Sequence, residues 1–217
     1  MAQISVNKLG EYMTATPTRR RSIVKDQQKE NPFIFARYND ARNAFCDLLT
    51  GSMSPDELDL KIEELSQFSS DKPMVESDKH ASAQALEVLK ELVDELEVKN
   101  VVIEKPAQFE DLSIQIAGVT VKARSDLLFR DAENNKIRGF VKLHFSQTAP
   151  LNQQAAHYVA ATLKRSLEEK FGDEVELDPK ISYVIDVPTE SVHESPKATK
   201  KLLKDVEAAC EEIAARW

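Results

Sequence analysis

Four polar residues in the second half of the chain have types and spacings that could carry out chemistry. Asp126 ends one strand-like segment, and Lys142 lies near the end of the next, Ile137–Phe145. In the helical segment that follows, Gln154 and Tyr158 are four positions apart, which places both side chains on one helical face. An acid, a lysine and polar helix residues in this order could act on a phosphodiester with a divalent metal.

One component of such a site is missing. A metal-dependent site of this layout has a carboxylate two residues before the lysine, and that position is Phe140. Mg²⁺ needs hard oxygen ligands in near-octahedral geometry, and a phenyl ring supplies none. Fold and activity are therefore separate questions for this chain.

The strand that carries Lys142 can be divided into two faces by its alternation. One face is expected to point to the core, and the other carries Phe140, Lys142 and His144. The core-facing residues are Val141, Leu143 and Phe145. A structural alternative for Lys142 remains open, because strand lysines commonly pack their stems on apolar surface and leave the ammonium in solvent.

From about residue 100 onward, apolar residues alternate, which predicts strands. Ala117–Gly118 is expected to close a tight hairpin. We expect Val119–Phe129 and Ile137–Phe145 to be neighbours in one mixed sheet, with the helix Asn152–Phe171 packed on it. The predicted strands are Val101–Glu104, Leu112–Ile116, Val119–Ala123, Asp126–Phe129, Ile137–Phe145 and Ile181–Val187; Pro188–Pro196 is a hairpin or loop and Lys197–Arg216 a helix.

The first half of the chain has apolar residues at helical intervals. Ser54-Pro55-Asp56-Glu57 is a strong helix start, with a capping Ser, a Pro in the first turn and acids at the positive end of the dipole. The predicted helices are Ile4–Gln28 with a break at Thr16-Pro17, Ile34–Leu49, Ser54–Phe68 and Ser77–Leu96. The fold class is therefore α/β or α+β: a helical region at 1–99 completes or caps a core at 100–217 with a mixed central sheet.

Composition and charge restrict the possible partners. The 217 residues are 41% hydrophobic and 30% charged, which is ordinary globular usage. The net charge of −8 does not attract DNA, so DNA binding would need a local basic patch, for which Arg19, Arg20 and Arg21 with Lys25 are the candidate. No apolar run suits a membrane span or a secretory signal, so a cytoplasmic location is expected.

A set of short motifs resembles a known nuclease family. The order Gly118–Asp126, then Gly139–Lys142, then Gln154 and Tyr158 looks like the RecB-like branch of the PD-(D/E)XK nucleases, which includes CRISPR-associated exonucleases. The N-terminal Ile4–Tyr12, followed by a Pro and an Arg cluster, also resembles the opening of that branch. The motifs are short but spread over most of the chain.

The resemblance implies a restriction-endonuclease-like core and roles for individual residues. Asp126 matches the first metal-binding acid. Lys142 matches the lysine that polarises the scissile phosphate or orients the attacking water. Gln154 and Tyr158 match the helix motif, and Glu104 matches an upstream acid that binds metal in some members.

Phe140 departs from the family's Glu-x-Lys motif. Glu104 is the nearest acid by topology that could take over the missing role, and His144 could serve with a softer metal such as Mn²⁺. The expected cofactor of an active enzyme is thus Mg²⁺ or Mn²⁺, with Glu104, Asp126 and His144 as candidate ligands.

An iron–sulfur cluster, which some CRISPR-associated relatives hold through four cysteines, is not expected. Thr16 precedes Pro17 where such relatives have a Cys, and the only cysteines are Cys46 and Cys210. Both are expected to be small buried residues.

Three functional hypotheses follow. The first is a DNA-processing or defence nuclease that uses Asp126, Glu104 and Lys142 with a divalent metal. The second is a degenerate relative that binds nucleic acid or a protein partner without cutting, and the third is a small α+β interaction protein whose motif match is accidental. For the first two we expect Asp126, Lys142 and Gln154 to point into one shared cleft, with Tyr158 one turn further along the helix.

Overall fold

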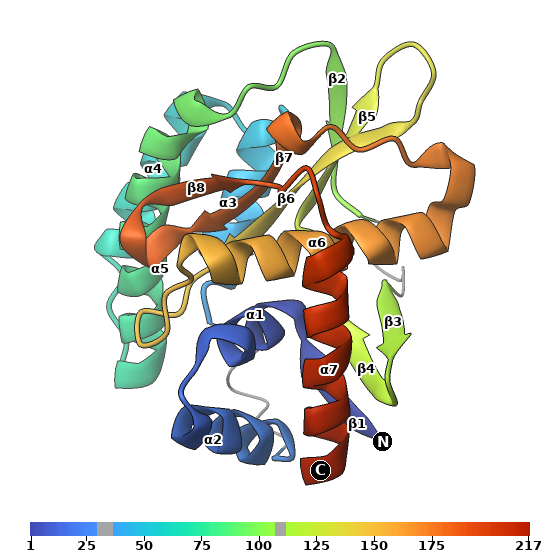
Figure 1. Cartoon of the computed structure of the whole chain (residues 1–217). Helices are drawn as coiled ribbons and strands as arrows, with labels where there is room; N and C mark the ends of the chain where they lie inside the picture. Colours follow the sequence, from blue (N-terminus) through green and yellow to red (C-terminus); the bar gives the residue numbers. More distant parts are fainter. Residues whose placement is uncertain (30–36, 107–111) are drawn as a thin grey trace.

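Two β-sheets form the framework of the protein, a computed structural model of which describes residues 1–29, 37–106 and 112–217 (Figure 1). The larger sheet has the strand order β2-β5-β6-β7-β8 and the smaller has β1-β4-β3. β6 pairs in parallel with β7, and β1 with β4, while the other neighbours are antiparallel. The strands are β1 (Ala2–Ser5), β2 (Val101–Glu104), β3 (Ser113–Ile116), β4 (Val119–Lys122), β5 (Leu127–Asp131), β6 (Ile137–His144), β7 (Ser182–Asp186) and β8 (Ser191–Glu194).

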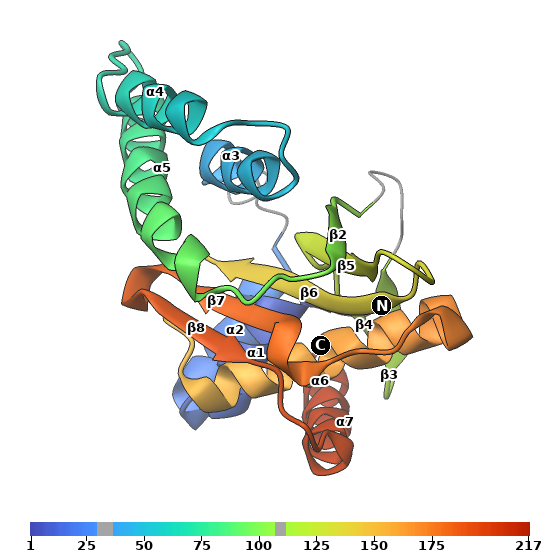
Figure 2. The ribbon, with the colours of Figure 1, turned by 90° about the horizontal axis from the view of Figure 1, so that it is seen from above.

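Helices cover both faces of the larger sheet (Figure 2). On one side lie α1 (Val6–Thr14), α2 (Pro17–Gln27), α6 (Gln153–Phe171) and α7 (Lys200–Arg216). On the other side lie α3 (Asn39–Leu49), α4 (Pro55–Ser66) and α5 (Pro73–Leu92). Short 3-10 helices span Val93–Glu95, Gly172–Glu174, Pro179–Ile181 and Val187–Thr189. The class is mixed α/β, as predicted.

Two hydrophobic cores sit on the two faces of the larger sheet. One joins α1, α6 and α7 to Leu128, Phe140 and Val184, and the other joins α3–α5 to side chains such as Phe129 and Val141. β6 runs between them, and its residues 139–144 are all buried. The predicted core side of β6 is confirmed, but the alternative in which the Lys142 ammonium stands in solvent is wrong: with helices on both faces, Lys142 is only 9% exposed.

The turn and capping predictions agree with the structure. The hairpin between β3 and β4 turns at Ala117 and Gly118, with φ angles of 45° and 80°. Ser54 begins α4 with a complete capping box to Glu57, and Pro55 is the first helical residue. The 188–196 segment contains β8, which forms an antiparallel hairpin with β7.

The N-terminus differs from the prediction of a helix from Ile4. Residues Ala2–Ser5 form β1, which pairs in parallel with β4 and buries Ala2 and Ile4. Ser5 then caps α1 by accepting a hydrogen bond from the Lys8 N–H. A strand of four residues has too few positions for its alternation to be visible beside a helical pattern.

The predicted single sheet of Val119–Phe129 with Ile137–Phe145 is also wrong in part. Leu127–Asp131 does pair with β6, but Val119–Lys122 belongs to the smaller sheet. The chain leaves one ladder before Ala123 and joins the other after Asp126, and Val119 and Val121 are buried in the α1–α6–α7 core. Helix α6 contributes to the core on the same face as Phe140, as expected.

The first hundred residues contribute to both cores. β1, α1 and α2 pack with α6 and α7, whereas α3–α5 pack on the opposite face. The start of the predicted helix Ile34–Leu49 lies partly outside the described residues, and its helical part, α3, begins at Asn39. In the described part of the chain, no helix combines the length and apolarity needed to cross a membrane.

Candidate functional site

Asp126 is the centre of a charged cluster at the start of β5. Its Oδ2 accepts hydrogen bonds from Lys142 Nζ at 3.0 Å and from the Leu143 N–H at 2.7 Å. Its Oδ1 lies 3.1 Å from Arg42 Nε on α3. The structure therefore brings the two predicted residues Asp126 and Lys142 together, and adds Arg42 as a second cation.

The cluster forms where the pairing of β5 with β6 stops. The Asp126 N–H donates to the Val141 carbonyl at 2.8 Å, and beyond this point β5 offers Leu143 no backbone partner. Buried backbone groups need hydrogen bonds, so side chains replace the strand. Asp126 accepts from the Leu143 N–H, and Asn7 Nδ2 on α1 donates to the Leu143 carbonyl at 3.0 Å.

Burial controls the electrostatics of this cluster. It lowers the pKa of Lys142 below its ordinary value, against the opposing effect of Asp126, and the charge of Arg42 adds to the lowering. The neighbouring Cys46 donates from Sγ to the Asp126 carbonyl at 3.7 Å, and burial, followed by the Asp126 charge, raises its pKa to about 12. Cys46 is therefore a protonated thiol at neutral pH.

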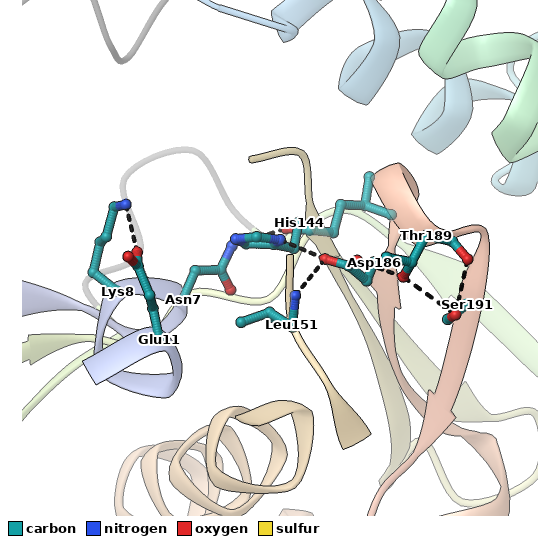
Figure 3. Close-up of polar contacts among 9 residues, drawn as sticks. Asn7, Lys8, Glu11, His144, Leu151, Asp186, Thr189 and Ser191 are labelled. Atoms are coloured by element: carbon teal, nitrogen blue, oxygen red, sulfur yellow. Dashed lines mark hydrogen bonds and ion pairs between the residues drawn. The ribbon is translucent and has the colours of Figure 1, made fainter. Parts of the chain in front are cut away.

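A second polar cluster joins the carboxyl ends of the parallel strands β6 and β7. His144 Nδ1 and Asp186 Oδ1 are 2.6 Å apart, and Asp186 also accepts from the Leu151 N–H at 3.0 Å and from Thr189 Oγ1 at 2.6 Å. Figure 3 shows His144 between Asn7 and Asp186. Carboxyl ends of parallel strands are common ligand positions in α/β folds, so the two clusters form one candidate site that shares β6.

The Asp186 carboxylate is strongly stabilised. Its burial would raise its pKa, but the hydrogen bonds from His144, Leu151 and Thr189 outweigh burial and lower the pKa below the ordinary value. Asp186 is fully buried and His144 is 4% exposed. This pair acts first as a structural connection between β6 and β7.

Several buried polar atoms around Asp126 have no hydrogen-bond partner within the described residues. They are Asn7 Oδ1, Arg42 Nε and the Oγ of Ser125, which precedes Asp126 in the chain. Arg42 Nε is close to Asp126 but is not aligned for a hydrogen bond. Each of these atoms can therefore take part in one further hydrogen bond.

Three predicted residues lie in other contacts. Glu104 on β2 accepts from Arg130 Nε at 2.6 Å, and within the described part of the chain it makes no hydrogen bond to Asp126 or Lys142. Tyr158 donates to Asp205 Oδ2 on α7 at 3.3 Å, and Gln154 hydrogen-bonds to Tyr158. The Gln154–Tyr158 pair thus interacts with α7, and no hydrogen bond among residues 1–29, 37–106 and 112–217 links it to the Asp126 cluster.

The donor set does not resemble a metal site. Across the described ranges, no group of three or more His, Cys, Asp and Glu side chains is placed to hold a metal ion, and this includes the candidates Glu104, Asp126 and His144. The oxygens of Asp126 already face two cations and a backbone N–H. Phe140 is fully buried in the α1–α6–α7 core.

The predicted arginine cluster is partly used inside the fold. Arg19 Nε donates to Glu11 Oε1 at 2.7 Å, and Glu11 also pairs with Lys8 at 2.6 Å (Figure 3). Arg20 donates to the carbonyls of Tyr12 and Met13, at 3.0 Å and 3.2 Å. Arg21 and Lys25 are exposed, which leaves them as the outward cations of the cluster.

Sequence reasoning missed three residues of the site. Asp186 carried a signal, because it lies at the end of a predicted buried strand where polar side chains gather. Asn7 and Arg42 carried no signal, because both are far from Asp126 and Lys142 in the sequence. Only the three-dimensional position of α1 and α3 brings them to β6.

No protein-family model matches the sequence, and no curated protein is significantly similar to it.

Proposed function

We propose that the chain is a PD-(D/E)XK-like protein of DNA processing or defence with a restriction-endonuclease-like core, whose metal site is incomplete and whose activity is nucleic-acid binding. The proposal is supported by the Asp126–Lys142 contact of 3.0 Å on adjacent strands β5 and β6. It is also supported by the order of elements, in which the hairpin, the lysine strand and the helix α6 follow one another.

One observation carries the proposal of an incomplete site. Asp126 Oδ2 accepts from Lys142 and from the Leu143 N–H, while Oδ1 faces Arg42. Mg²⁺ and Mn²⁺ need several free oxygen ligands. The Arg42 guanidinium takes the position beside the carboxylate that a metal ion would need. Phe140 stands at the position where the acid that completes such a site is expected. The residues present therefore do not fit the metal.

The same cluster suits a phosphate. Arg42 is the most exposed member, with 35% of its side chain accessible, and its guanidinium is a planar donor that matches phosphate oxygens. Lys142 provides a second, buried positive charge behind it. Because the whole molecule carries a net charge of −8, we expect binding to be local and strongly salt-dependent.

The test compares DNA binding and cleavage over a titration of Mg²⁺ and of Mn²⁺. Fluorescence anisotropy with labelled single- and double-stranded DNA should show binding in EDTA that Arg42→Gln weakens by about tenfold, the loss of one good charged contact. The control is Arg165→Gln, which removes a similarly exposed arginine that pairs with Glu169 on α6. Arg21→Gln tests the N-terminal cluster as the alternative DNA contact.

The cleavage assay decides between the proposal and an active nuclease. We expect no metal-dependent product from the unmodified protein. Robust cleavage that Asp126→Ala abolishes would overturn the incomplete-site proposal, because it would mean that another acid completes the site. Absence of any nucleic-acid binding at low salt would instead favour the protein-interaction alternative.

A further inference from the structure

An open cavity of about 560 Å³ lies on the side of the sheet covered by α3–α5. Most of its lining comes from one face of the first half of α5, and Arg37 and Gln147 close it from the segments before α3 and after β6. The polar residues that line it are Arg37, Glu76, Ser77, His80, Gln84 and Gln147. Its volume lies in the range of small-molecule ligand sites.

Contacts with α5 hold the backbone that follows Arg37. Tyr38 has a positive φ of 62°, which is rare for a bulky residue and is maintained only where the surroundings fix it. Its N–H donates to Asp78 Oδ1 on α5 at 3.2 Å, and Lys79 of α5 pairs with Asp40 of α3 at 2.7 Å. These contacts fix the start of α3 against α5.

A column of rings connects the cavity to the Asp126 cluster. The Arg37 guanidinium lies 5.3 Å from the Tyr38 ring centre, and Tyr38 stacks on Phe145 with centroids 5.0 Å apart. The Arg42 guanidinium lies 5.4 Å from the Phe145 ring centre. The strained conformation of Tyr38 thus aligns one guanidinium at the cavity with another at Asp126.

The lining has the donors and acceptors that a nucleotide needs. A guanidinium binds a phosphate, and the carboxamides of Gln84 and Gln147 can each donate to and accept from a base edge. Glu76 can accept from an amino or hydroxyl group. His80 Nε2 is already 2.9 Å from the Phe68 carbonyl, so only its other ring nitrogen is available to a ligand.

We infer that this cavity binds one unstacked nucleotide of a single strand, with Arg37 at one of its phosphates and Arg42 at a neighbouring phosphate. This inference rests on the proposed function, since it supplies the substrate class of the same site. A base can enter the cavity only from a single strand or an end, so the protein selects single-stranded over double-stranded nucleic acid.

The experiment measures anisotropy of labelled 12-nucleotide single strands, as DNA and as RNA, for each of the four homopolymers, together with a duplex. Gln84→Leu and Arg37→Gln should each weaken single-strand binding at least fivefold and reduce its base preference, and leave duplex binding unchanged. The matched control is Gln3→Leu, which removes an exposed carboxamide on β1 of the smaller sheet. Circular dichroism of each variant verifies folding.

The outcomes separate this inference from the proposed function. If Arg42→Gln weakens binding but the two cavity variants bind every strand as the unmodified protein does, the inference is overturned and the proposed function stands. If the unmodified protein binds no polynucleotide, the proposed function fails, and calorimetric titration with the 5′-mononucleotides decides the cavity. Saturable binding of a mononucleotide by the unmodified protein that is lost in Gln84→Leu supports a nucleotide site in the cavity. If no mononucleotide binds to the unmodified protein, the inference is overturned.

Discussion

At the scale of single residues, the buried ion pair between Lys142 and Asp126 is the most consequential feature. Their side chains are 11% and 7% exposed, and Asp126 is the carboxylate that pairs with Lys142, while Asp126 itself also faces Arg42. Such pairs contribute little net stability relative to apolar residues, but removal of one partner leaves an uncompensated buried charge. The pair is therefore maintained as a unit.

We predict that Asp126→Ala lowers the free energy of unfolding by about 3–5 kcal/mol, since it leaves Lys142 and the Leu143 N–H without their acceptor. The double variant Asp126→Ala/Lys142→Met should recover part of this loss, because the buried Lys142 charge is then removed as well; the rest is not recovered, since Arg42 and the Leu143 N–H still lack their partner. Urea unfolding of the two single variants and the double variant gives the coupling. Losses that simply add would show that the two charges do not depend on each other.

The hydrogen bonds of Asp186 predict a pH dependence. Its pKa in the folded protein is below the ordinary value of 3.8, so its stabilising contribution is present above the pKa of the unfolded chain. Between the two pKa values the unfolded state binds a proton that the folded state does not, and stability falls as the pH falls. The contribution is lost as the pH drops through the folded pKa.

We therefore expect the urea midpoint of the unmodified protein to fall more steeply between pH 5 and pH 2.5 than that of Asp186→Asn. The substitution removes the titrating group, although it also lowers stability at neutral pH. Asp173→Asn, at an exposed position, is the control and should retain the slope of the unmodified protein. Equal slopes for Asp186→Asn and the unmodified protein would contradict the prediction.

At the scale of elements, β6 organises both clusters because it is enclosed on both faces and approached closely at Gly139. A Cβ at this position would overlap the carbonyl oxygen of Ile181, in the segment before β7. The contact is to backbone, which cannot rotate away as a side chain can.

Gly139→Ala is expected to lower the free energy of unfolding by about 1–3 kcal/mol through overpacking. The shift of β6 against β7 should also weaken DNA binding, because it moves Lys142 and His144. Chemical denaturation and anisotropy measure the two effects. The control Ala132→Gly, in the turn after β5, should leave both nearly unchanged.

The sequence predicted the elements better than their partners. Alternation and turn residues were sufficient for the β3–β4 hairpin, β6 and α4, because those signals are local. The pairing of β1 with β4 and the separation of β4 from β5 were missed, since pairing depends on contacts between positions more than a hundred residues apart, such as Ala2 with Val119. Arg42 was also missed, because its contact with Asp126 joins two positions that are far apart in the sequence.

Phe140 has one place in the sequence motif and another in the packing of the fold. From sequence it is the residue that replaces a metal ligand. In the structure it also fills the α1–α6–α7 core with Leu128 and Val184. Under the proposed function, the residue that stands in place of the acid is therefore also a core residue, and a carboxylate placed there would be surrounded by apolar side chains.

At the scale of the whole molecule, two cores share the larger sheet, and each contains one cysteine. Cys46 lies in the core with α3–α5, and Cys210 in the core with α6 and α7. Burial raises the pKa of both thiols to about 12. Each thiol therefore reports on the opening of its own core.

The last prediction tests whether the 1–99 and 100–217 regions unfold as separate domains. Because β1, α1 and α2 pack with the second region and α3–α5 pack on the sheet of that region, we expect one cooperative unit. In the native protein at pH 8, a thiol reagent should label neither cysteine. The Cys210→Ala variant reports the labelling of Cys46, and the Cys46→Ala variant reports the labelling of Cys210. With increasing urea, labelling in each variant should follow the loss of the helical signal of that same variant, with one midpoint for both signals. If Cys46 became reactive well before the helical signal of its own variant was lost, the α3–α5 core would open independently, and the cavity at Arg37 would belong to a unit that separates from the sheet.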